Sequence, residues 1–353
     1  MRERKANTCL PLSKLLASPP GKKGFYWGRY SFSGCHTATR KTRFFFIEFS
    51  AVSIRRQPPK AAPPVEGSFD LLKIVAPNAV LPEGTAQIPQ EMPGKYVQVR
   101  AGISGKDGRM FEARFPFSAV SVTGDEVSIQ DGQIKFSESK LKGMVRKGIF
   151  WELSLSNAQP GGGTQFAGTL RIDRDEYSVS PGLSQGHMDR MYGSDLPERW
   201  FYLSCAHLVS NINGRKLEHS FFESHGIFSN KITVVAVING IRYEFNVKKL
   251  FSRSTQTFNC TKTGDAIHWS VSIQRRTLVI DIDVSCKTTD LKLKVYDLPQ
   301  AENKSIEILS GVTGKAEIRL YKPTGKTLEL IEYARSSHTL CEYGETKQEL
   351  FEI

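Results

Sequence analysis

A group of polar side chains that could take part in acid–base chemistry lies within residues 186–193, GHMDRMYG. Its members are His187, Asp189, Arg190 and Tyr192. Gly193 and a proline that follows it favour a turn, and the apolar residues 200–208 predict a strand. We therefore expect the polar group at the mouth of a strand, between two β units, where ligand sites are common.

The rest of the chain alternates between apolar and polar residues, as strands with one buried face do. In residues 278–284 every second residue is Leu, Ile or Val, and Asn239-Gly240 separates two apolar runs as the turn of a hairpin does. Almost no helical period appears, so the pattern predicts an all-β chain. About eighteen expected strands suit two antiparallel β-barrels in tandem, each wide enough for one small ligand.

Charge and glycine content suggest how the chain is divided. Residues 1–60 hold 13 Lys or Arg and two acids, and so account for most of the net charge of +12. We expect a basic flexible arm at 1–23, a first β domain at 24–165 and a second at 166–353, with the boundary near the Pro-Gly-Gly-Gly run at 160–163. The nearly neutral body argues against nucleic-acid binding. The arm could instead contact an anionic membrane, act as an organelle transit peptide, or be a solvated leader.

Other sequence features restrict the class of protein. No apolar run is long enough for a membrane helix, and no secretory signal is recognisable. Six cysteines lie far apart without metal-ligand spacing, so we expect neither a metal site nor a disulfide framework. The sequence predicts a cytoplasmic protein without a cofactor. Peripheral membrane contact through the arm and an organelle location remain alternatives.

Residues 186–205, GHMDRMYGSDLPERWFYLSC, resemble the junction segment of the tocopherol cyclase family. The segments NGIRYEF (239–245), IHWSVSI (267–273) and GKAEIRLY with GKTLELIEY (314–333) follow in the order of that family. HMDRMYG also resembles the aspartate-bearing motif of the related carotenoid hydratases, although Arg-Met-Tyr stands where that motif has His-Asn-Trp. The resemblance implies two lipocalin-like barrels and an isoprenoid or prenylated ligand. Both families begin their reactions by protonating an alkene, which requires an acid in a dry pocket.

The resemblance assigns roles to individual residues. Asp189 is the candidate proton donor, and His187 would orient it or relay protons; the alternative for Asp189 is capping of its own turn. Arg190 could instead hold Asp189 ionised. The candidate ligand-binding residues are Tyr192, Trp200, His207, His219, Glu223 and Trp269. Asp281 and Asp283 are better explained as members of a solvated strand face than as a catalytic carboxylate pair.

Three hypotheses follow from the sequence. The first is an enzyme that cyclises or hydrates a prenyl double bond by acid catalysis, an isomerase of the tocopherol cyclase type. The second is a carrier that binds the isoprenoid without turnover. The third is a membrane-surface interaction protein.

Overall fold

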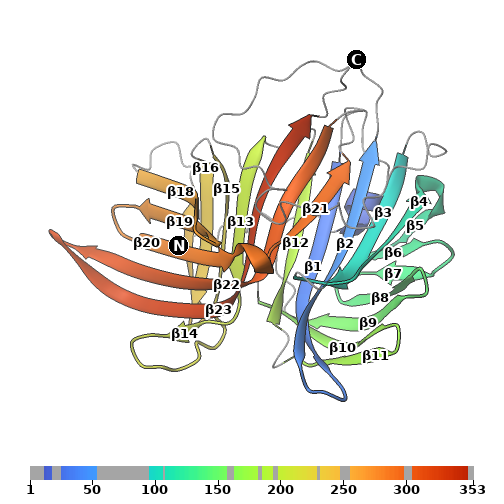
Figure 1. The fold of residues 1–353 in the computed structure, drawn as a ribbon, viewed down its shortest axis with the longest axis horizontal. Helices are drawn as coiled ribbons and strands as arrows, with labels where there is room; N and C mark the ends of the chain where they lie inside the picture. Colours follow the sequence, from blue (N-terminus) through green and yellow to red (C-terminus); the bar gives the residue numbers. More distant parts are fainter. Residues whose placement is uncertain are drawn as a thin grey trace.

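The computed structural model describes residues 12–17, 25–53, 95–105, 108–156, 163–181, 185–193, 198–228, 231–246, 255–297 and 304–348. Two curved antiparallel sheets form two lipocalin-like β units in tandem, as predicted, and they stand side by side in Figure 1. The described residues include three short helical turns, α1 (Leu12–Leu16), η1 (Phe117–Ala119) and η2 (Thr288–Asp290). No helix in these ranges is long and apolar enough to cross a membrane.

The first sheet has twelve strands and the second has eleven. The first consists of β1 (Phe25–His36), β2 (Thr42–Ser53), β3 (Lys95–Ile103), β4 (Met110–Pro116), β5 (Val120–Thr123), β6 (Glu126–Ile129), β7 (Ile134–Phe136), β8 (Lys140–Val145), β9 (Ile149–Ser156), β10 (Thr164–Ile172), β11 (Asp175–Val179) and β12 (Gln185–Gly193). The second consists of β13 (Arg199–Cys205), β14 (Val209–Ser210), β15 (Phe221–Ile227), β16 (Lys231–Ile238), β17 (Ile241–Asn246), β18 (Thr255–Thr263), β19 (Ala266–Gln274), β20 (Val279–Lys287), β21 (Lys292–Asp297), β22 (Lys304–Thr324) and β23 (Thr327–Gln348).

The strands follow one another as a meander, except at a few crossover pairings. In the first sheet the order is β4-β3-β2-β1-β11-β10-β9-β8-β7-β6-β5, and β12 pairs with β1 and β10. In the second the order is β17-β16-β15-β13-β23-β22-β20-β19-β18, with β14 on β23 and β21 on β22. The Asn239-Gly240 hairpin predicted from sequence joins β16 to β17, with both turn residues at positive φ.

The chain passes from one sheet to the other between Gly193 and Arg199, later than the boundary predicted after residue 165. The predicted boundary falls inside β10. Strand β10 pairs with β9, and β12 pairs with β1 across the whole of residues 187–193, so both belong to the first sheet.

The structure of the predicted flexible arm, residues 1–23, differs in part from the prediction. Within it, Leu15 and Leu16 of α1 are buried in the core of the first sheet.

Large side chains fill the core that each curved sheet encloses. Among the fully buried ones are Trp151, Tyr30, Phe45, Phe49, Phe136 and Phe166 in the first core and Trp269, Phe201, Phe222, Phe245 and Tyr343 in the second. Burial of this much apolar surface is the main stabilising contribution to both units. These packed clusters differ from the apolar ligand cavity that was expected inside a barrel.

The two sheets meet along a seam, formed by the outer face of β1, β2 and β12 and the facing surfaces of β13, β21, β22 and β23. Strand alternation places Tyr30 and Phe32 in the first core and Arg29 on the opposite face of β1, toward the second sheet. Arg29 is 3% exposed, so the polar face of β1 is buried by the neighbouring sheet. The seam therefore encloses polar and charged side chains from both halves of the chain.

Candidate functional site

Three charged residues stand in a row on the first sheet, on its seam face. Arg29 of β1 lies opposite Asp189 of β12 on one side and opposite Glu48 of β2 on the other. Side chains opposite one another in a sheet point to the same face, so the three lie next to one another. Two residues of the second sheet contact this row. They are Tyr202 of β13, which contacts Asp189, and Glu342 of β23, which contacts Arg29, and they lie opposite each other in the second sheet.

Arg29 joins the two sheets through its guanidinium group. Its Nη1 donates to Glu342 Oε1 at 2.5 Å, and its Nη2 and Nε donate to Asp189 Oδ2 at 3.2 and 3.4 Å. The Glu48 carboxylate lies 4.0 Å from Nη1. Burial disfavours the charge, but Glu342, Asp189 and Glu48 outweigh it and hold the pKa of Arg29 well above its ordinary value. Arg29 is therefore a permanent cation between the sheets.

Asp189 carries a buried carboxyl group that is protonated more easily than an ordinary aspartate. Burial raises its pKa from 3.8 to about 6; Glu223 and Glu342 add to the rise, while Arg29 and the Tyr202 hydrogen bond oppose it. The Tyr202 hydroxyl lies 2.6 Å from Asp189 Oδ1. A carboxyl group with a pKa near neutrality can serve as a general acid at physiological pH.

The charge balance of the cluster agrees with this assignment. Two buried cations, Arg29 and Lys294, face three buried carboxyl groups. Lys294 Nζ is 3.4 Å from Glu48 Oε1. Burial would raise the pKa of Glu342, but Arg29 and Lys294 outweigh it and lower that pKa below its ordinary value. Glu342 thus stays ionised, and of the two carboxyl groups that bond directly to Arg29 it is Asp189 that takes up a proton near neutral pH.

Replacing Tyr202 by Phe is expected to raise the pKa of Asp189 further above 6. The tyrosine hydroxyl donates to the ionised carboxylate and lowers that pKa, so its removal favours the protonated acid. Carboxyl carbon chemical shifts of Asp189, followed by NMR through a pH titration, measure the change. A lower pKa in the variant would show that the hydroxyl does not act on the carboxylate as described.

His187 lies on the same face of β12 as Asp189, two residues away, and it is buried. Its Nδ1 is 2.8 Å from Ser204 Oγ of the second sheet. The Ser204 hydroxyl also lies 3.2 Å from the Phe222 carbonyl of β15, which accepts from it. His187 therefore helps to join the sheets; its predicted role in orienting Asp189 or relaying protons stays a prediction.

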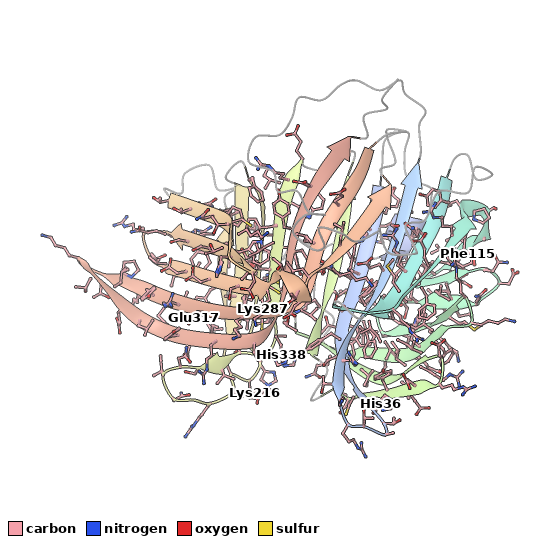
Figure 2. All side chains as sticks on the ribbon, in the orientation of Figure 1. His36, Phe115, Lys216, Lys287, Glu317 and His338 are labelled. Carbon is pink, nitrogen blue, oxygen red and sulfur yellow. The ribbon has the colours of Figure 1, made fainter. Side chains whose placement is uncertain are left out.

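Two small hollows lie in the seam, each lined by both sheets. One, of about 30 Å³, has aromatic and histidine walls: Ser31, Phe32, Phe44, Phe45, Ser104, Gly186, His187, Ala206, His207, Val312, His338 and Leu340. Figure 2 labels His338 in this region, where the sheets meet. The other, of about 10 Å³, lies beside Lys292 and Lys294. Hollows of these sizes hold only one or two waters.

Two of the predicted ligand-binding residues lie at the seam. Glu223 of β15 is close enough to raise the pKa of Asp189. His207 lines the larger hollow, where burial, His338 and Lys216 lower its pKa. Trp200 is half-buried on β13, opposite Gly344 of β23.

Other predicted residues lie elsewhere. His219 is an exposed turn residue with φ 48°, and its carbonyl accepts a hydrogen bond from Gly240. Trp269 is buried in the core of the second sheet, because the alternation of β19 directs it inward. Arg190 pairs with Glu138 at 3.1 Å, so the arginine beside Asp189 is Arg29 instead. Tyr192 lies on β12 opposite Tyr26, but its side chain is outside the described part of the structure.

The strand face bearing Asp281 and Asp283 is polar, as expected. Asp281 accepts from Ser272 at 2.6 Å, and Asp283 accepts from Ser270 and Arg319. These neighbours account for both carboxylates without a catalytic role.

The sequence did not single out four charged members of the cluster, Arg29, Glu48, Lys294 and Glu342. Each is buried, with an exposure of 6% or less. One signal was present: Glu48 is the only acid in the run RFFFIEFSAV, and a charged residue within an apolar strand requires a partner.

Comparison with known proteins identifies no family. No family model matches the chain, and no curated protein matches it, so the resemblance to the tocopherol cyclase family receives no support from a family match. Among solved structures, a protein of Nitrosomonas europaea provisionally described as AttH is similar at 12% identity and a TM-score of 0.47, covering 97% of this chain and 98% of that one. Kievitone hydratase from Nectria haematococca is similar at 12% identity and a TM-score of 0.41, covering 94% and 92%.

Proposed function

We propose that this protein binds an unsaturated apolar ligand, such as an isoprenoid or a prenylated quinol, at the seam, and that Asp189 donates the proton that starts addition across its double bond. The observation that carries the proposal is the buried Asp189 carboxyl group, whose pKa of about 6 makes it an acid near neutral pH. Its place between two sheets is typical of ligand sites.

The proposed reaction has two proton transfers that balance. The Asp189 carboxylic acid gives its proton to one alkene carbon and leaves a carbocation on the other. Water, or a hydroxyl group of the ligand, then bonds to the cation and returns a proton to the Asp189 carboxylate. The first choice gives hydration and the second gives cyclisation. Between the steps, Arg29 and Tyr202 stabilise the carboxylate, because both donate to it.

Access to Asp189 requires the seam to widen. The hollows of about 30 and 10 Å³ are far smaller than the several hundred Å³ typical of ligand pockets. The ligand must therefore part side chains of the two sheets, such as those around His187. Such widening also exposes the charged cluster, so ligand affinity depends on how firmly Arg29 holds the sheets together.

A turnover assay with a matched pair of variants tests the proposal. Purified full-length protein is incubated with a prenylated hydroquinone and, separately, with an acyclic isoprenoid, and the products are separated by mass spectrometry. Hydration adds the mass of water, whereas cyclisation leaves the mass unchanged and alters retention. Asp189→Asn keeps the shape but removes the acid, and is expected to lower turnover by at least about 100-fold.

Asp283→Asn is the control, since Asp283 lies on an exposed strand face away from the seam. It should turn over substrate like the parent protein. Full activity in Asp189→Asn would exclude this residue as the acid. Binding of the isoprenoid by the parent protein without any product would instead identify a carrier.

A further inference from the structure

The hairpin formed by β22 and β23 continues past its neighbours in the second sheet. Its strands contain 21 and 22 residues and pair with each other up to Thr324 and Thr327. The pairing of β20 with β22 ends at Tyr321, and that of β14 with β23 begins at Ala334. Within the described residues, strand pairing of residues 322–330 is confined to the hairpin itself, and contact with the 210–211 segment begins only at Glu332 and Tyr333. Figure 1 shows it as a tip that projects beyond β18, β19 and β20.

The hairpin tip, residues 321–330, carries an exposed apolar face. Among the described residues, the large apolar side chains that are exposed are Ile212, Ile241, Leu328 and Leu330, and two of them are here. Leu328 is 52% exposed and Leu330 43%. Leu330 lies opposite Tyr321, and Leu328 opposite Pro323, so these four side chains share one face. Apolar residues gathered at a protruding tip indicate a contact surface.

Basic residues lie beside this apolar face. The tip contains Lys326 at its turn and Lys322 on the other face of the hairpin, where Lys322 stands opposite the one acid of the tip, Glu329. The adjacent turn between β19 and β20 adds the exposed Arg276, while Arg275 of the same turn donates to the Glu244 carbonyl and lies over the Phe245 ring. This end of the sheet is therefore positive and complements an anionic surface. Attraction of Lys and Arg to an anionic membrane contributes about 1 kcal/mol for each residue near the surface.

Pro323 and the two lysines of the tip disfavour backbone pairing of this hairpin with the strand edge of a second copy of the protein. Pro323 cannot donate a backbone hydrogen bond, and lysines at an edge oppose edge-to-edge association. A lipid surface needs no backbone pairing, since its partners are acyl chains and headgroup phosphates.

We propose that the tip of the β22–β23 hairpin docks the protein on an anionic lipid membrane. Leu328 and Leu330 enter the boundary between headgroups and acyl chains, while Lys322 and Lys326 lie against headgroup phosphates. This docking is independent of any chemistry at Asp189.

Vesicle co-sedimentation of the full chain tests the proposal. Vesicles of phosphatidylcholine alone are compared with vesicles that also contain phosphatidylglycerol. The parent protein should bind the anionic vesicles, and added salt should weaken the binding. The double variant Leu328→Ser with Leu330→Ser should lower the partition coefficient by about tenfold or more, as loss of two buried leucines predicts. Lys322→Glu with Lys326→Glu should have a similar effect.

The matched control is Ile212→Ser with Ile241→Ser, which removes two equally exposed apolar side chains elsewhere. It should bind like the parent protein. Unchanged binding by the leucine variant would overturn the proposal and place the contact elsewhere, for example in residues 1–23. Equal binding to neutral vesicles would overturn it as well. So would a dimer in sedimentation velocity that the leucine variant abolishes, because the tip would then be a protein interface.

A fluorescence measurement covers the case in which the leucine variant does not fold. In Leu328→Trp the new indole replaces an exposed side chain, so the sheet is preserved. Its emission should shift to shorter wavelength on addition of anionic vesicles, relative to the parent protein. Absence of that shift would contradict insertion of the tip.

Discussion

Replacement of Arg29 by Met is expected to destabilise the protein by about 3–5 kcal/mol at pH 7. The guanidinium group contacts Asp189 and Glu342 and lies within 4.0 Å of Glu48, and all these groups are buried. Met fills a similar volume but leaves the carboxylates without their shared cation. Urea unfolding at equilibrium measures the loss.

The control for this change is Arg171→Met, which removes an exposed arginine on the outside of β10. Its effect should be within about 0.5 kcal/mol. The loss in Arg29→Met should become smaller at pH 5, because protonation of Asp189 removes one uncompensated charge. A loss below about 1 kcal/mol at pH 7 would show that the carboxylates do not depend on Arg29.

Asp189→Asn is expected to stabilise the protein relative to the parent as pH rises from 4 to 8. In the folded protein burial raises the pKa of Asp189 to about 6, above its ordinary value of 3.8. The stability that this group contributes is therefore fully present below about pH 4 and is lost as pH rises through 6. Asn does not titrate. The free energy of unfolding of the variant should therefore exceed that of the parent by an amount that grows by up to about 3 kcal/mol between pH 4 and 8.

Unfolding free energies measured at several pH values would reveal this growth, with Asp283→Asn as the exposed control. A difference between Asp189→Asn and the parent that stays constant from pH 4 to 8 would show that the carboxyl group titrates normally. If Asp189 is the catalytic acid, turnover should decline over the same interval in which stability declines, because both follow one proton.

Much of the fold follows from local sequence patterns. The alternation in residues 278–284 and the Asn239-Gly240 turn correspond to β20 and to the β16–β17 hairpin. These features depend on neighbouring residues only. The point at which the chain changes sheets was less predictable, since it depends on β12 pairing with β1, and their partners Arg29 and Asp189 are 160 residues apart.

The site was predictable only in part, for the same reason. Asp189 and His187 stand in one short motif, and both lie on the buried seam face of β12. Glu342 could not be connected with them, because the Arg29–Glu342 bond spans 313 residues of sequence. Trp269 shows another limit: alternation predicts which residues share a face, but not whether that face meets a core or a neighbouring sheet.

The cross-sheet bonds of Arg29 imply that the two halves of this chain have to change together. Glu342 contributes a carboxylate that pairs directly with Arg29 of the other half, to which Asp189 and Glu48 also belong, while Lys294 of its own half adds a second positive charge nearby. A chimera that takes one half from a distant homologue would contain a buried charge without its partner, unless the homologue supplies the complementary charge. Substitutions at Arg29 and Glu342 should consequently appear in pairs among related sequences.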